Sequence, residues 1–208
     1  KFKRTIASQY FRYALMTLLS AFLVPISQML LRGYVISEIS ITEAGWWEGM
    51  NRISNMYLMV ITSSFSVYYL PRLSEISDRI ELRHEIFKCY KVIVPLLLAG
   101  FTVIYFLRFF IVKLLFTHEF MPMTQLFIWQ MAGDFFKICS WLLAFLMVAK
   151  SMTKAYISTE IIFTLSYILL GYTFIRFDGI VGLCQAYLTN YVLYLAVLTF
   201  MFRKLLLR

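Results

Sequence analysis

Long, predominantly apolar segments constrain this chain more than any other feature of its sequence. Six runs reach about 20 residues, which an α-helix needs to cross a hydrocarbon core about 30 Å thick. They are too long for β-barrel strands and lack a period of two. We therefore expect an all-α polytopic membrane protein, with six transmembrane helices near residues 11–31, 46–70, 87–107, 123–149, 155–175 and 180–202.

The composition points to the same class of protein. Hydrophobic residues make up 61% of the chain and charged residues only 15%, and the mean hydropathy is +0.75. These values lie outside the range of soluble globular domains. The three cysteines are widely spaced in or beside apolar segments, so we expect buried, inert thiols and neither a disulfide framework, a metal site nor a cofactor.

The distribution of lysine and arginine predicts the orientation. If the N-terminus is placed in the cytoplasm, fourteen of the twenty basic residues fall on the cytoplasmic side and four on the outer side. This bias predicts cytoplasmic positions for both termini. It also explains most of the net charge of +9 without nucleic acid as a partner. The shorter apolar run at 109–117 is expected to lie along the outer interface.

The second predicted span carries polar residues along one helical face. Glu48, Asn51, Arg52 and Asn55 stand at positions i, i+3, i+4 and i+7. A charged side chain near the bilayer centre costs about 2.5 to 3.5 kcal/mol on insertion scales, so such groups turn towards a bundle interior or a watery cavity. We therefore expect the helices to surround a polar cavity that these four residues line.

The fourth predicted span carries a second polar stripe. Gln130, Asp134 and Lys137 stand at i, i+4 and i+7, about midway across the membrane. Asp134 and Lys137 are spaced to pair, which lowers the cost of burying both charges. The stripe is a candidate part of the cavity, and an inter-helix strut is the alternative.

Further candidate cavity residues lie on the first and last spans. Arg12 is near the inner end of span one, Gln28 and Arg32 are near its outer end, and Gln185 is on span six. Glu160 lies in the first turns of span five. For each of them an interfacial or snorkelling position is the alternative. Three tyrosines of span six are expected to pack between helices: Tyr187, Tyr191 and Tyr194.

The sequence contains no recognisable catalytic motif. It has no G-x-S-x-G, no P-loop, no Rossmann glycine set and no histidine inside a predicted span. We expect a transporter and not an enzyme. A membrane enzyme that acts on polyprenyl-linked glycans, with Asp134 or Glu48 as a base, remains an alternative.

Several segments resemble one family of transporters, the Wzx-type flippases of lipid-linked O-antigen and enterobacterial common antigen units. The likeness extends over essentially all of the chain. The segments that carry it are WWEGMNRISNMYLMVITSSFSVYYLPRLSEI from residue 46, WQMAGDFFKI at 129–138, MVAK at 147–150, AYISTE at 155–160 and QAYLTNYVLY at 185–194.

The resemblance implies that residues 1–208 form the C-terminal six-helix lobe of a twelve-helix transporter of the multidrug/oligosaccharidyl-lipid/polysaccharide exporter superfamily, with the N-terminal lobe absent. The chain opens without Met or a signal peptide, which also suggests the interior of a longer chain. In such transporters two lobes alternate access around a central site. A drug or metabolite exporter half of the same superfamily and a non-transporting scaffold in polysaccharide assembly are the remaining alternatives.

The resemblance also implies a substrate, a location and partners. The substrate is an undecaprenyl-diphosphate-linked oligosaccharide, moved across the bacterial inner membrane from the cytoplasmic to the periplasmic leaflet for lipopolysaccharide O-antigen or common antigen synthesis. The partners are membrane lipids, the N-terminal lobe and the polysaccharide polymerase machinery. Asp134 and Lys137 match a GDxxK pattern of the family, and Arg12 and Arg32 match basic positions. Arg52 replaces a small polar residue and is expected to tune glycan selectivity.

Overall fold

The computed structural model describes the backbone of residues 4–206 and the side chains of residues 14–206. Throughout this part of the chain the regular structure is helical, which confirms the all-α class. The elements are α1 (Arg4–Glu38), α2 (Ile41–Ser64), the π-helical η1 (Phe65–Tyr69), α3 (Leu70–Glu75), α4 (Arg79–Leu115), the 3₁₀-helical η2 (His118–Leu126), α5 (Phe127–Ala149), α6 (Thr153–Met201) and α7 (Arg203–Leu206).

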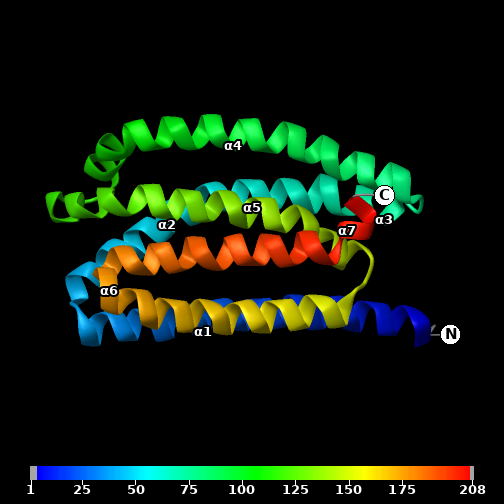
Figure 1. Ribbon diagram of the computed structural model, residues 1–208, viewed down its shortest axis with the longest axis horizontal. Helices are drawn as coiled ribbons and strands as arrows, with labels where there is room; N and C mark the ends of the chain where they lie inside the picture. Colours follow the sequence, from blue (N-terminus) through cyan, green and yellow to red (C-terminus); the bar gives the residue numbers. More distant parts are fainter. Residues whose placement is uncertain (1–3, 207–208) are drawn as a thin grey trace.

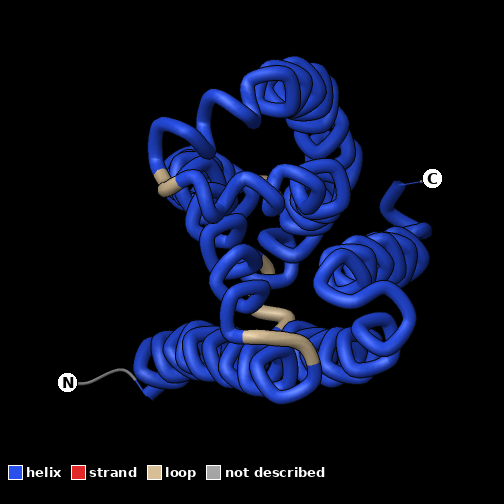
Figure 2. Tube along the Cα trace, turned by 90° about the vertical axis from the view of Figure 1, so that its left-hand side faces the viewer, coloured by secondary structure: helices blue, strands red, loops and turns tan. Residues whose placement is uncertain are grey.

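The long helices lie roughly parallel and form one bundle (Figures 1 and 2). Helix α5 packs most extensively on α6, α6 packs on α1, and α4 lies against α5 on the opposite side. Side-chain caps fix two of the helix starts. Ser40 accepts a hydrogen bond from the Glu43 amide at the start of α2, and Asp78 accepts from two amides at the start of α4.

Helix α6 consists of two arms that fold back on each other at Asp178 and Gly179. Gly179 has φ +55° and ψ −137°, a conformation that favours glycine. The arms run side by side in opposite directions (Figure 1), and Phe163 on the first arm lies 4.7 Å, centroid to centroid, from the Tyr194 ring on the second. The predicted spans at 155–175 and 180–202 thus fall on separate arms of one hairpin.

Gly182 is the tightest point of this hairpin. A Cβ atom there would lie 2.1 Å from the carbonyl oxygen of Phe174, and a backbone oxygen cannot move aside cheaply. We expect Gly182→Ala to lower the free energy of unfolding by about 2 kcal/mol or more, as overpacking does. Thermal unfolding of the purified protein measures this. Gly100→Ala is the matched control, because nothing lies within 4 Å of the added methyl group; equal melting temperatures for the two variants would contradict the packing.

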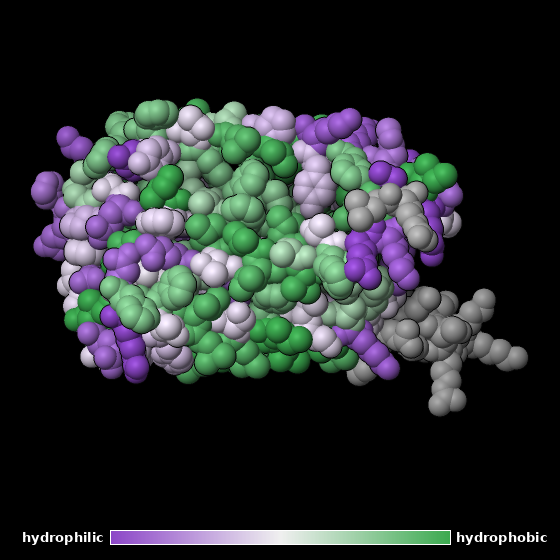
Figure 3. All heavy atoms as spheres, in the orientation of Figure 1, coloured by the Kyte–Doolittle hydropathy of each residue, from purple (hydrophilic) through white to green (hydrophobic). Residues whose placement is uncertain are grey.

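The surface is that of a polytopic membrane protein. An apolar belt lies between two polar ends (Figure 3). Among the described residues, four helices are long and apolar enough to cross a membrane: Ala14–Glu38, Arg79–Leu115, His118–Ala149 and Thr153–Met201. Helix α2 is not among them, and its polar residues lower its hydropathy. The expectation of an interfacial segment at 109–117 is wrong, because α4 continues unbroken to Leu115.

The bundle has two apolar cores with a polar layer between them. One core contains Met50 of α2 and Met131 of α5. The other begins at Leu58 of α2 and Ile138 of α5. Between these positions each helix carries polar groups at the same depth, including Ser54 on α2 and Asp134 on α5. The sequence therefore places a polar layer near the middle of an apolar bundle.

Candidate functional site

Asp134 is the centre of the polar layer and is fully buried. Its carboxylate accepts hydrogen bonds from three hydroxyl groups on two other helices. Ser54 Oγ lies 2.6 Å from Oδ2, Tyr57 also donates to Oδ2, and Tyr187 Oη lies 2.7 Å from Oδ1. Three donors compensate much of the cost of burying this group. Asp134 therefore joins α2, α5 and α6.

The glycine of the GDxxK pattern allows this arrangement. A Cβ atom on Gly133 would lie 2.3 Å from Cδ1 of Tyr187. The absence of a side chain there lets the tyrosine ring lie against α5, where its hydroxyl reaches Asp134. The close approach of Tyr187 thus explains the glycine of the GDxxK pattern in this fold.

Lys137 lies on the other side of the same tyrosine. Its Nζ donates to Tyr187 Oη over 3.0 Å, and it lies 5.3 Å from the ring centroids of Trp141, Tyr187 and Tyr191. Such contacts favour a cation by about 0.5 to 2 kcal/mol. Three aromatic rings therefore surround the ammonium group.

The predicted direct pair of Asp134 and Lys137 is wrong. Within residues 14–206 no ion pair joins them; the Tyr187 hydroxyl accepts from Lys137 and donates to Asp134. Helical spacing brings the two side chains to adjacent positions, but the donors on α2 and α6 hold the carboxylate in the core. Lys137 instead lines a cavity that Asp134 does not reach.

This cavity has a volume of about 70 Å³ and lies between α1, α2, α5 and both arms of α6. Of the predicted site residues, Gln28, Asn51 and Lys137 come together in its wall. Lys137 is the one basic residue among the described lining residues, and Glu160 is the one acidic residue. The lining residues are Val24, Ser27, Gln28, Asn51, Lys137, Glu160, Phe163, Thr164, Tyr167, Tyr187, Asn190, Tyr191 and Tyr194.

The cavity wall offers free hydrogen-bonding capacity beside aromatic faces. Asn190 is buried, and in the described part of the chain its Oδ1 has no hydrogen-bond partner. Glu160 Oε2 accepts from Ser20, 3.2 Å away, at one side of the cavity. A wall with a cation, amides, hydroxyls and tyrosine rings suits a polar ligand that carries hydroxyls and negative charge.

Asn190 and the tyrosines were not among the predicted site residues. Tyr187, Tyr191 and Tyr194 lie at i, i+4 and i+7, and Asn190 falls on the same face. Tyrosine at this spacing more often packs between helices, so the pattern alone favoured that interpretation. The buried asparagine within the tyrosine stripe was the signal that could have identified a cavity wall.

The predicted stripe on α2 divides into two parts. Asn51 lines the cavity, whereas Arg52 and Asn55 are exposed. Glu48 binds two arginines, with Arg32 Nη1 at 2.8 Å and Arg52 Nη2 at 2.9 Å. We call Arg32, Glu48 and Arg52 the charged rail. Exposed pairs of this kind add only about 0 to 1 kcal/mol to stability, so the rail is free to exchange partners.

The remaining predicted site residues lie elsewhere. Gln185 donates to Asp178 at the bend of α6, 2.7 Å away, and does not line the cavity. Gln130 is buried and does not line the cavity, and in the described structure its Oε1 has no partner. The Arg12 side chain lies outside the described residues. No group of three His, Cys, Asp or Glu that could hold a metal occurs among the residues described.

Comparisons with known proteins place these features in context. No protein-family model matches the chain, and no solved structure matches it. Two curated relatives, both named "Lipid III flippase", are from Escherichia coli (strain K12) and Shigella flexneri. Each is 31% identical over 192 residues, which cover 92% of this chain and 46% of the relative. The chain is therefore similar to Wzx-type lipid-linked oligosaccharide flippases over nearly its whole length, as its motifs predict, and it spans about half the length of the curated relatives it matches.

Proposed function

We propose that this chain is the C-terminal lobe of a flippase that moves an undecaprenyl-diphosphate-linked oligosaccharide to the periplasmic leaflet. The observation that carries the proposal is a polar, tyrosine-lined cavity at mid-depth in the bundle, with Lys137 as the one lysine among its described lining residues. The chain that forms this cavity is similar to lipid III flippases. The head group would occupy this polar space while the polyprenyl tail stays in lipid.

The proposed architecture has six membrane crossings in residues 1–208. α1, α2, α4, α5 and the two arms of α6 would supply them, with both termini in the cytoplasm of a bacterium and the lobe in its inner membrane. The bias of basic residues supports this orientation. A second lobe would complete a twelve-helix transporter, with the exposed charged rail facing it across the substrate path. Membrane lipids surround the bundle, and the polymerase machinery would receive the product.

Different cavity residues would bind different parts of the head group. Lys137 would bind the diphosphate or an acidic sugar as a point charge. The faces of Tyr167 and Tyr191 would contact sugar rings, and the amides of Asn51 and Asn190 would bond hydroxyl groups. Each of these residues lines the cavity.

The charged rail would bind the head group before it enters the cavity and after it leaves. Arg32 and Arg52 share one carboxylate, Glu48, so either guanidinium could leave it and bind a diphosphate bidentately. Glu48 would then hold the other arginine. Asp134 acts differently, because it orients Tyr187 and through it Lys137. It is a positioning residue in this mechanism.

Complementation tests the function. The full-length protein is expected to restore surface polysaccharide in a bacterium that lacks its lipid III flippase or its O-antigen flippase, because the cavity accepts lipid-linked glycans. Surface polymer is measured with membrane abundance in parallel. Normal abundance without rescue in either strain would contradict the proposal, and drug resistance without rescue would favour the exporter alternative.

A further inference from the structure

A second pocket lies at the end of the bundle where α4 begins and α7 lies. It has a volume of about 420 Å³ and is lined by three basic side chains and two apolar ones. We call it the basic pocket, and its residues are Arg79, Ile80, Arg83, Lys204 and Leu205. It is remote from the polar cavity, with which it shares no lining residue.

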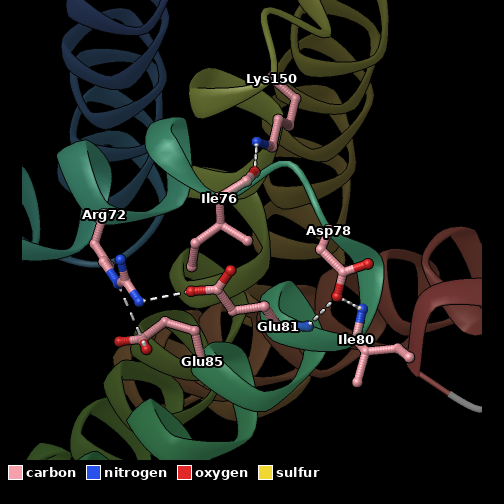
Figure 4. A network of polar contacts seen from close by, with 7 residues as sticks. All are labelled: Arg72, Ile76, Asp78, Ile80, Glu81, Glu85 and Lys150. Atoms are coloured by element: carbon pink, nitrogen blue, oxygen red, sulfur yellow. Dashed lines mark hydrogen bonds and ion pairs between the residues drawn. The ribbon is translucent and has the colours of Figure 1, made fainter.

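The carboxylates near the basic pocket are already engaged elsewhere. Figure 4 shows Arg72 between Glu81 and Glu85, at distances of 2.8 and 3.9 Å. Asp78 accepts hydrogen bonds from the amides of Ile80 and Glu81 at the helix start. These contacts occupy all three carboxylates, and none of the three lines the pocket.

The three cations of the basic pocket therefore lack counter-ions within the protein. In the described part of the chain no ion pair includes Arg79, Arg83 or Lys204. Three positive charges around one pocket repel each other, and an anion that binds there relieves the repulsion. The charge of the pocket thus favours a ligand with more than one negative charge.

The apolar part of the basic pocket favours a lipid over a soluble anion. The Ile80 side chain is 77% exposed beside the arginines. The guanidinium of Arg83 lies 5.7 Å from the ring centroid of Phe87, and that of Arg203 lies 4.3 Å from the ring centroid of Phe200. Both rings are exposed, so the cations sit at the edge of an apolar surface. Arginine beside exposed aromatic rings is typical of a membrane interface.

We infer that the basic pocket binds the phosphate head group of an anionic phospholipid, whose acyl chains lie along the exposed apolar surface beside α4. Basic pockets between helices at a membrane surface bind such head groups, and each cation near the surface contributes about 1 kcal/mol. A phospholipid with two phosphates, diphosphatidylglycerol, matches three cations best. This site is independent of the substrate path.

Native mass spectrometry of the full-length protein tests the site. Protein mixed with equal amounts of diphosphatidylglycerol and phosphatidylethanolamine is expected to retain the anionic lipid. The triple variant R79Q/R83Q/K204Q is expected to bind it at least about tenfold more weakly. The single variant Lys204→Gln, an exposed change with little risk to folding, is expected to bind it about threefold more weakly.

A matched control removes the same charge from the same end of the molecule. The triple variant K88Q/K91Q/K154Q changes three exposed lysines outside the pocket and is expected to bind the lipid like the wild type. Equal losses in both triple variants would overturn the site and indicate general surface charge. Retention of the lipid by R79Q/R83Q/K204Q and Lys204→Gln would also overturn it. Displacement of the phospholipid by an equal amount of a polyprenyl diphosphate would assign the pocket to the transported lipid instead.

Discussion

Asp134→Ala is expected to lower the free energy of unfolding by about 3 kcal/mol or more. The change leaves the hydroxyls of Ser54, Tyr57 and Tyr187 without their shared acceptor. Each buried unsatisfied donor costs about 1 to 3 kcal/mol, and the three belong to helices that Asp134 joins. Thermal unfolding of the purified protein and abundance in the membrane measure the loss.

Two comparison variants make the Asp134 result specific. Asp134→Asn keeps one carbonyl acceptor and nearly the same shape, so its loss is expected to be less than half as large. Glu75→Ala removes an exposed carboxylate from α3 and is expected to change stability by less than about 0.5 kcal/mol. If the Asp134→Ala protein has the same melting temperature as the wild type, the three hydroxyl hydrogen bonds do not hold the helices together.

The sequence predicts the class of fold well. An apolar run of about 20 residues or more fits a membrane-spanning helix. In lipid all backbone polar groups must be paired, and a helix pairs them within the segment itself. The predicted spans at 155–175 and 180–202 leave Asp178 and Gly179 between them, where the bend of α6 lies, and glycine accepts the backbone conformation found there. The extent of α4 was missed because a run of nine residues, seven of them apolar, does not reveal whether it continues a helix or starts a new one.

The candidate site was predictable only in part. The spacing of Glu48 and Arg52 correctly suggests a pair on one helix, whereas Arg32 reaches the same carboxylate only through the packing of α1 on α2. Likewise, the spacing of Asp134 and Lys137 does not reveal that Tyr187, fifty residues after Lys137, lies between them. Local periodicity gives the face of a helix, and tertiary packing decides what that face meets.

Lys137→Ala is expected to reduce transport about ten- to hundredfold while the protein remains in the membrane. Lys137 is the one basic side chain among the described residues of the cavity wall. A hydrogen bond to a charged group contributes about 1.5 to 3 kcal/mol, which corresponds to this loss. Lys137→Arg keeps the charge and is expected to retain part of the activity. Lys154→Ala, an exposed change outside the cavity, is expected to behave as the wild type.

The most direct test is the surface polysaccharide of a flippase-deficient bacterium that produces the full-length protein with Lys137→Ala, normalised to membrane abundance. A head group that binds in the polar cavity predicts loss of surface polymer with unchanged abundance, and partial recovery with Lys137→Arg. Full surface polymer in the Lys137→Ala strain would mean that the head group does not use this lysine, and that the cavity is not the path of transport.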